Sequence, residues 1–157
     1  SNNVLSDTAT AQAVFSSPSS VSLSGTTSYE FEASYLITRA AGTTSHTTAV
    51  LFNCTNALTS IAYVADVTTS TGVALTALNR IYGTGVTGVT VTGASTSATE
   101  NLVITLRGIM RTNAATVVTP QFQYSAAPGG APTVLPNSYI KFTPLGNSTV
   151  ASIGNWS

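Results

Sequence analysis

An alternation of apolar and polar side chains between Ser28 and Ile37 is the clearest pattern in the chain. Apolar residues occupy the odd positions and polar residues the even positions as far as Ser34; the apolar set is Tyr29, Phe31, Ala33, Tyr35 and Ile37. Successive side chains of a β-strand point to opposite faces of its sheet. The segment is therefore predicted to form a strand with one buried face and one solvent-exposed face.

Shorter apolar or alternating segments rich in Val and Thr, which favour strands, occur at steady spacing along the rest of the chain. We predict strands over residues 13–15, 21–23, 47–52, 58–67, 86–92, 102–110, 116–124, 139–142 and 150–156, while residues 74–82 fit either a strand or a helical turn. Turns such as Gly83-Thr84-Gly85 and Pro128-Gly129-Gly130 separate these segments. No segment combines apolar residues at helical spacing with helix caps.

Many short strands at this spacing predict an all-β fold, an antiparallel β-sandwich that is jelly-roll-like. We expect residues 1–157 to form a single domain, in which the polar residues 1–10 are a short extended N-terminal arm. Much of the core packing is expected from eight aromatic residues: Tyr29, Phe31, Tyr35, Phe52, Tyr63, Phe122, Tyr124 and Phe142. Some of the tyrosines are expected at a subunit interface, because a buried hydroxyl needs a hydrogen-bond partner.

Charged residues make up only 6% of the chain, five basic and five acidic, and the net charge is zero. An average globular protein has about a quarter charged residues. The surface must therefore be solvated mainly by hydroxyls and amides, which favours a protein packed against copies of itself or against a larger shell. The same composition disfavours a freely diffusing enzyme, and the absence of a basic patch disfavours a nucleic-acid partner.

No run approaches the roughly 18 apolar residues of a membrane helix, and the first residues lack the basic start and apolar block of a signal peptide. We therefore expect no membrane partner, and a chain that is either mature or produced in the cytoplasm. The single cysteine, Cys54, excludes an intrachain disulfide. A reactive thiol or an intermolecular disulfide is possible, but a small buried apolar side chain is the favoured interpretation.

His46 is the only histidine, and no G-x-S-x-G motif accompanies it. A structural, hydrogen-bonding role is favoured over catalysis. A zinc site needs three or four ligands, and one His with one Cys does not supply them. The carboxylates Asp7, Asp66 and Glu100 are scattered along the chain and form no cluster of metal ligands in the sequence. We predict no catalytic residues, no metal site and no cofactor.

Glu30 and Glu32 share one face of the predicted strand, at a spacing that glycosidases also use. Alternation on a solvated face produces the same spacing without any chemistry, so a solvated or ion-paired role is favoured. Arg107 and Arg111 are the expected partners, within one subunit or across a subunit boundary.

Several stretches resemble a recurrent domain of tailed-bacteriophage structural proteins. They are SYEFEASY at residues 28–35, GTTSHT at 42–47, LRGIMRTNA at 106–114, TPQFQYSAAPGGAPTV at 119–134 and GNSTVASIGNW at 146–156. The resemblance implies a jelly-roll-like domain, trimeric, on a capsid or in a tail fibre. The long N-terminal stalk usual in fibre proteins is missing, which favours the capsid if the chain is whole.

Two functions follow as expectations. The first is a virion structural protein, a homotrimeric capsid decoration (cement) protein that stabilises a phage head by non-covalent binding on the capsid surface. Its partner is then the major capsid protein or another virion protein, and residues 1–10 are the expected capsid contact. The alternative is a receptor-binding or carbohydrate-binding tip domain of a tail fibre, in which Tyr82, Tyr139 or Trp156 would stack on sugars.

Overall fold

The computed structural model describes residues 2–69 and 80–148. Within these ranges the regular secondary structure is entirely β, in twelve strands. No helix in the same ranges has the length and apolar character that would cross a membrane. The predicted strand at 150–156 and residues 74–79 of the ambiguous segment lie outside the described residues.

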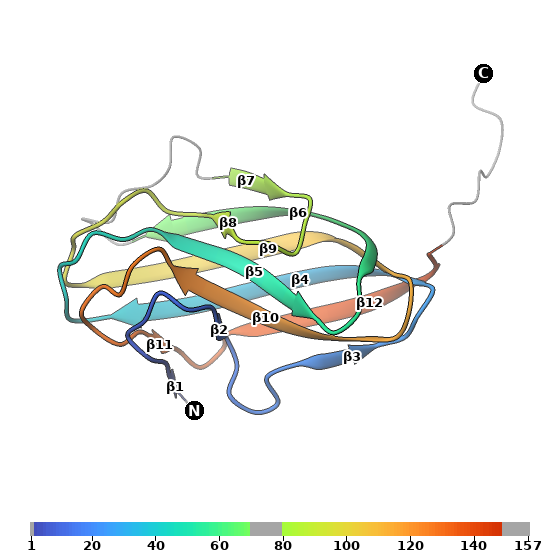
Figure 1. Cartoon of the computed structure of the whole chain (residues 1–157), viewed down its shortest axis with the longest axis horizontal. Helices are drawn as coiled ribbons and strands as arrows, with labels where there is room; N and C mark the ends of the chain where they lie inside the picture. Colours follow the sequence, from blue (N-terminus) through green and yellow to red (C-terminus); the bar gives the residue numbers. More distant parts are fainter. Residues whose placement is uncertain (1, 70–79, 149–157) are drawn as a thin grey trace, which may run out of the picture.

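Two antiparallel sheets pack face to face (Figure 1). Sheet A contains β1 (Asn3–Val4), β4 (Thr27–Arg39), β6 (Leu58–Thr69), β7 (Arg80–Gly83), β9 (Glu100–Thr112), β11 (Thr133–Val134) and β12 (Tyr139–Asn147). Sheet B contains β2 (Gln12–Ala13), β3 (Val21–Leu23), β5 (Thr48–Cys54), β8 (Val89–Thr90) and β10 (Thr116–Tyr124). The prediction of an all-β antiparallel sandwich is confirmed.

The chain changes sheet between most consecutive strands. It passes from β3 in sheet B to β4 in sheet A and β5 in sheet B, and later from β8 to β9 to β10 in the same alternation before β11 and β12 return to sheet A. This alternation links the two sheets into one sandwich around a shared core. The β6–β7 hairpin adds to the edge of sheet A beside β9.

The alternating segment predicted first is the centre of sheet A. β4 pairs with β9 along twelve residue positions and buries its odd-numbered side chains from Tyr29 to Arg39, with exposed fractions of 7% or less. Between the sheets, the rings of Phe31, Phe52 and Tyr63 contact one another with centroids 5.4–6.0 Å apart. Edge-to-face and tilted arrangements of this kind are favourable for aromatic rings.

Most predicted strands coincide with observed strands, although the long ones extend further than their periodicity indicated. The segments at 21–23 and 116–124 match β3 and β10 at both ends, whereas 102–110 becomes β9 and 139–142 becomes β12, each several residues longer. Two-residue strands β1 and β11 were not predicted. Such short strands are defined by their partner, since two residues contain no period.

The predicted N-terminal arm is extended, but it lies along its own sandwich. Asn3 and Val4 pair with β11, and the side chain of Asn3 donates to the carbonyl of Val14 over 2.9 Å. Further along, the carboxylate of Asp7 accepts from the backbone N–H of Gly129 over 3.1 Å. An arm reaching a neighbouring molecule would first have to break these contacts.

Candidate functional site

The charged side chains are distributed very unevenly over the molecule. Of the ten charged residues, Arg39 and Glu100 are buried and Asp7 lies in the N-terminal arm. The other seven project from the outer face of sheet A, here called the charged face: Glu30, Glu32, Asp66, Arg80, Arg107, Arg111 and Lys141. The strands of sheet B therefore carry no charged side chain.

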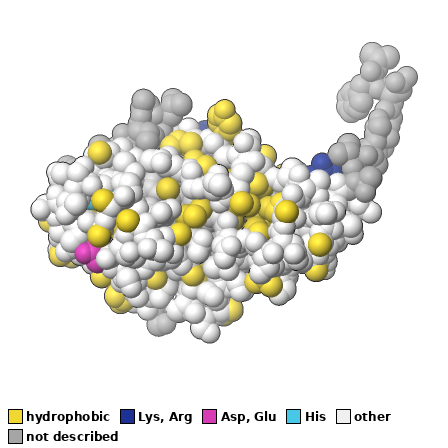
Figure 2. Space-filling view, in the orientation of Figure 1, with side chains coloured by type: hydrophobic (Ala, Val, Ile, Leu, Met, Phe, Trp, Pro, Cys, Tyr) yellow, Lys and Arg dark blue, Asp and Glu magenta, His cyan; other side chains and the backbone are white. Residues whose placement is uncertain are grey.

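Strands β5 and β10 form this second surface, here called the uncharged face. Their alternate residues are buried, so the remaining ones point outward: Ala49, Leu51, Asn53, Val117, Thr119, Gln121 and Gln123. Among the cross-strand neighbours on it, Gln121 lies opposite Leu51 and Gln123 opposite Ala49, while Thr119 lies opposite Asn53. In the view over β5 and β10, most of the surface is white or yellow, and an acidic side chain shows in magenta toward the left (Figure 2).

Ion pairs on the charged face differ from those predicted. Glu32 pairs with Lys141, whose Nζ lies 3.9 Å from the carboxylate, although Arg107 occupies the opposite position on β9. Arg111 donates to the backbone carbonyl of Ser148 over 2.5 Å. Within one subunit the expected pairing of the two glutamates with Arg107 and Arg111 is not formed, because β12 inserts Lys141 beside β4 on the side away from β9. Their pairing across a subunit boundary stays a prediction.

A second ion pair on the charged face joins Arg80 of β7 to Asp66 of β6. Arg80 donates through Nε over 2.7 Å and through a terminal nitrogen over 3.3 Å. The hydrogen bond and the charge of Asp66 both raise the pKa of Arg80. Both side chains are largely exposed, so the pair contributes little to stability.

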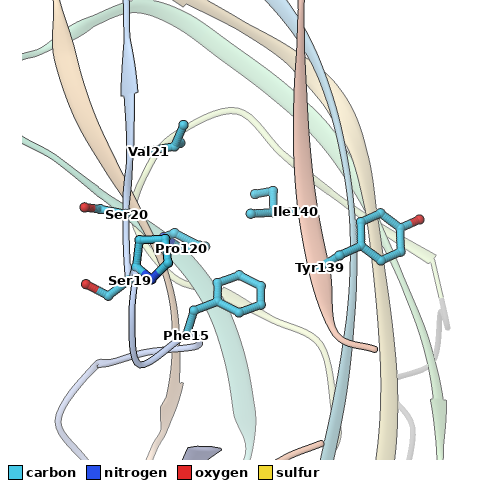
Figure 3. A pocket seen from close by; sticks show the side chains of 8 residues that line it. Phe15, Ser19, Ser20, Val21, Pro120, Tyr139 and Ile140 are labelled. Carbon is cyan, nitrogen blue, oxygen red and sulfur yellow. The ribbon is translucent and has the colours of Figure 1, made fainter. Parts of the chain in front are cut away.

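An apolar groove of about 320 Å³ lies at the open edge of the sandwich, between β3 and β10 on one side and β12 on the other. Phe15 and Ile140 point into it, while the hydroxyls of Ser19 and Ser20 point away (Figure 3). Tyr139, one of the three predicted sugar-stacking residues, forms part of its wall and is 46% exposed. Tyr82 is 76% exposed on β7, and Trp156 lies outside the described residues.

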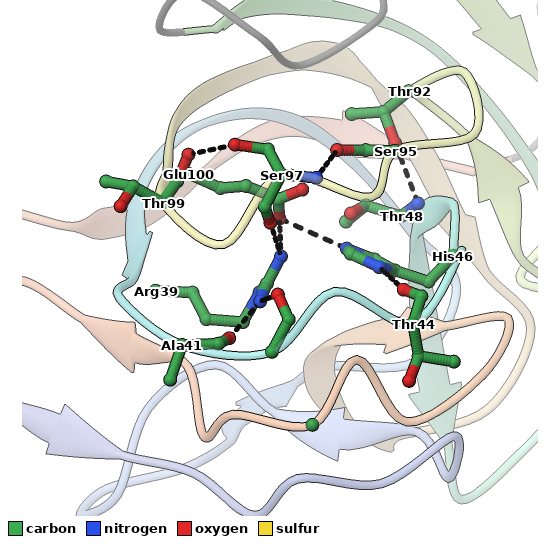
Figure 4. A network of polar contacts seen from close by, with 12 residues as sticks. Arg39, Ala41, Thr44, His46, Thr48, Thr92, Ser95, Ser97, Thr99 and Glu100 are labelled. Atoms are coloured by element: carbon green, nitrogen blue, oxygen red, sulfur yellow. Dashed lines mark hydrogen bonds and ion pairs between the residues drawn. The ribbon is translucent and has the colours of Figure 1, made fainter.

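A polar network fills the end of the sandwich where β4 ends and β9 begins (Figure 4). Arg39 and Glu100 are cross-strand partners, and a terminal nitrogen of Arg39 lies 3.0 Å from Oε2 of Glu100. Nε2 of His46 lies 3.1 Å from the same oxygen. Arg39 also donates to the backbone carbonyls of Ala41, Gly42 and Ser97.

Burial and hydrogen bonding act on Glu100 in opposite directions. Desolvation alone raises the pKa of the carboxyl group, but hydrogen bonds from Ser95, His46 and Arg39 outweigh it, and the pKa lies below its ordinary value. Glu100 is therefore a carboxylate at neutral pH. Arg39, His46 and Glu100 are each only 2% exposed, so no substrate reaches them in this conformation. The arrangement holds two loops together, which agrees with the structural role favoured for His46.

Cys54 is half-buried at the end of β5 and packs against the core. Burial raises the pKa of its thiol, which lowers the fraction of reactive thiolate. This environment fits the predicted role as a small apolar side chain. Among residues 2–69 and 80–148, no group of three or more His, Cys, Asp or Glu side chains is placed to hold a metal ion.

Sequence reasoning singled out His46 and Glu100 separately but did not bring them together, and it did not single out Arg39. They are separated by up to 61 residues along the chain, and only the pairing of β4 with β9 makes them neighbours. Comparisons of the chain with protein-family models, with curated proteins and with solved structures find no match.

Proposed function

We propose that this protein is a virion structural protein, a homotrimeric decoration protein that binds the outside of a phage head and stabilises it without chemistry. The observation that supports this most is the separation of the charges among the strands: seven lie on the outer face of sheet A and none on the outward positions of β5 and β10. The cores of protein interfaces are depleted in charged residues. The uncharged face is accordingly proposed to contact other subunits, and the charged face to meet solvent.

The partial burial of the outward side chains on the uncharged face also supports a contact with other subunits. Six of its seven outward residues are half-buried in the isolated chain, and only Asn53 is exposed. Burying amides and hydroxyls at an interface has a small free-energy cost when they form new hydrogen bonds there. Burying an unpaired charge costs several kcal/mol. A shell of many identical copies is one environment in which such a surface is covered.

The first experiment introduces one charge on each face. Gln121→Glu places a carboxylate at the middle of the uncharged face, and Val103→Glu is its matched control on an outward position of β9, where the native side chain is 41% exposed. We expect sedimentation equilibrium to show a trimer for the native protein and for Val103→Glu, and a smaller species for Gln121→Glu. A native protein that remains monomeric at high concentration would contradict the proposal.

The second experiment counts copies in particles. If the protein decorates a head, quantitative mass spectrometry of purified virions should find it in hundreds of copies, as a lattice requires. A few dozen copies at most would point to a tail fibre instead. Truncating residues 1–10 is a weaker test, since it also removes β1 and the contact of Asp7 with Gly129.

A carbohydrate-binding tip domain is the second candidate, and the groove beside Tyr139 is the observation that favours it. Aromatic rings at the rim of a groove stack on sugars, and small-ligand sites are concave and mostly apolar. If this function is correct, the native protein binds a sugar on a glycan array and the Tyr139→Ala variant does not. The Tyr82→Ala variant should still bind, because Tyr82 lies on β7, apart from the groove. Absence of glycan binding leaves the decoration protein as the proposal.

A further inference from the structure

Arg107 is the one basic side chain of the charged face that makes no ion pair or hydrogen bond within the part of the chain that the structure describes. Its opposite neighbour on β4, Glu32, is bound to Lys141 instead. Its opposite neighbour on β6 is Val64, which carries no charge. A guanidinium presents its N–H donors in a planar fork that matches a carboxylate. Arg107 is therefore free to bind an anionic group from outside the chain.

A hollow of about 280 Å³ lies next to Arg107 on the charged face, over the neighbouring strands β7, β6 and β9 (Figure 1). Tyr82 of β7 forms one wall, and Arg107 and Ile109 of β9 form the other. Between the walls, β6 presents the shorter side chains of Ala62 and Val64. Because the walls are large side chains and the floor is made of small ones, a ligand can enter between β7 and β9.

Two apolar side chains of the hollow stand in solvent. Tyr82 is 76% exposed and Ile109 39%, and they are two of the six large hydrophobic side chains that are exposed among the described residues. An exposed aromatic ring beside a hollow can stack on the C–H face of a sugar ring. Val64 pairs with Tyr82 on one side and with Arg107 on the other. The strands that carry the ring and the guanidinium are thus two strand spacings apart, about 10 Å.

We propose that this hollow binds a uronic-acid residue of an acidic polysaccharide, with its carboxylate on the Arg107 guanidinium and the C–H face of its ring on Tyr82. An inorganic anion would use only Arg107, and a neutral sugar would use only Tyr82. A ligand that carries both groups on one ring uses the whole hollow. The site lies on the face that the proposed function leaves in solvent, but it is a property of the single chain and does not depend on that function.

The charges around the hollow favour an anion. The charged face carries four basic and three acidic side chains. Asp66, the acidic residue of β6, already accepts from two nitrogen atoms of Arg80. Glu30 and Glu32 lie on β4, which is separated from the hollow by β9. The unpaired charge at the edge of the hollow is therefore that of Arg107, and salt should weaken its attraction for a carboxylate because both groups are exposed.

This hollow is distinct from the groove beside Tyr139. The groove lies beside β12, on the other side of β4 and β9, and its described lining has no charged side chain. A sugar bound in the groove therefore needs no carboxylate. The Tyr82→Ala variant separates the two sites, since it should retain a neutral sugar in the groove and lose an acidic sugar in the hollow.

The first test compares two ligands that differ only in charge: a tetrasaccharide of galacturonic acid, and the same tetrasaccharide with its carboxyl groups reduced to alcohols. Titrated into isotope-labelled native protein and followed by amide NMR, the acidic form should bind and shift signals of β6, β7 and β9. The reduced form should bind about tenfold more weakly, the usual effect of losing a charge-assisted hydrogen bond. No binding of the acidic form, or equal affinity for both forms, would overturn the proposal.

The second test locates the site with variants whose amide spectra verify that they are folded. Arg107→Gln should weaken binding of the acidic tetrasaccharide about tenfold, because the carboxylate loses its charged donor. Arg111→Gln is the matched control, since it removes the same charge from the same face of β9 but lies outside the hollow. It should bind as tightly as the native protein. An equal loss in both variants would show a general attraction to the charged face and would overturn the proposed site.

Discussion

At the scale of single residues, two tyrosine hydroxyls stand out because they are buried without a partner. The hydroxyl oxygens of Tyr35 and Tyr63 make no hydrogen bond within the described residues, whereas that of Tyr29 accepts from the backbone N–H of Ser24 over 2.9 Å. Burial raises the pKa of Tyr63 to about 12 and raises that of Tyr35 further. The expectation that buried tyrosines would find partners at a subunit interface does not apply to these two, which point into the core.

The missing partners predict that Tyr35→Phe leaves the free energy of unfolding unchanged or raises it by about 1 kcal/mol, since an unsatisfied buried hydroxyl is costly. Tyr29→Phe is the control and should lose about 1 kcal/mol, because Ser24 then has no acceptor. Urea denaturation of the three proteins measures both effects. A clear loss in Tyr35→Phe would mean that its hydroxyl has a partner in solution.

The lowered pKa of Glu100 predicts how the stability of the protein responds to acid. Its pKa is lower in the folded state than the ordinary value of 4.5, so its contribution to stability is complete above that pH and is lost as the pH falls through the lower folded value. Glu100→Gln leaves Arg39 buried with a neutral partner and should cost about 3–5 kcal/mol at pH 7. Glu30→Gln, on the exposed face of the same sheet, should cost almost nothing.

Denaturation curves at pH 7 and pH 3.5 test this assignment. The native protein should lose more stability between the two pH values than Glu100→Gln, which has no carboxyl group to protonate at that position. Equal losses in both proteins would show that Glu100 is not the source of the acid sensitivity.

At the scale of elements, the centre of sheet A depends on a close approach between β9 and β6. Gly108 of β9 pairs with Tyr63 of β6, and a Cβ atom at position 108 would overlap the carbonyl oxygen of Ala62 and the Cβ of Tyr63. Both obstacles belong to the neighbouring strand, so they cannot move without shifting the sheet.

Gly108→Ala is therefore predicted to destabilise the protein by roughly 1–3 kcal/mol, the usual cost of overpacking. Gly85→Ala is the control, because the nearest side chain to its Cβ is 3.6 Å away. Thermal unfolding followed by circular dichroism compares the two. An equal effect in both variants would mean that β6 and β9 adjust their spacing more easily than their register indicates.

Strand β12 shows how a chain with one lysine protects a sheet edge. Among the described strands β12 pairs only with β4, so its other side is an edge. Lys141, Pro144 and a register shift between Pro144 and Gly146 all occur on it. Lysine, proline and bulges are the devices that discourage edge-to-edge pairing. This edge is thus better protected than the low charge content alone suggested.

At the scale of the whole molecule, the separation of charged and uncharged faces makes the orientation of any assembly testable. Lys141 is the only lysine, and its side chain is 65% exposed on the charged face. We expect amine-reactive reagents to modify it at the same rate in the free protein and in the assembled particle. Protection of Lys141 on assembly would show that the charged face, and not the uncharged one, is the interface.

The order of hydrophobic and polar residues by itself determined the strands and their buried faces. Tyr29, Phe31 and Tyr35 are buried as the alternation in β4 predicted, because strand geometry fixes where every second side chain points. The low charge content likewise predicted a surface solvated mainly by uncharged groups.

Tertiary structure decided everything that depends on which strands become neighbours. The pairing of β4 with β9 joins Arg39 to Glu100, the insertion of β12 gives Glu32 its lysine, and the pairing of β5 with β10 creates the uncharged face. The alternation of hydrophobic and polar residues involves only a few neighbouring positions, whereas these contacts join positions 50 or more residues apart. The energy that selects them comes from packing two sheets around one core, which no single segment of the chain contains.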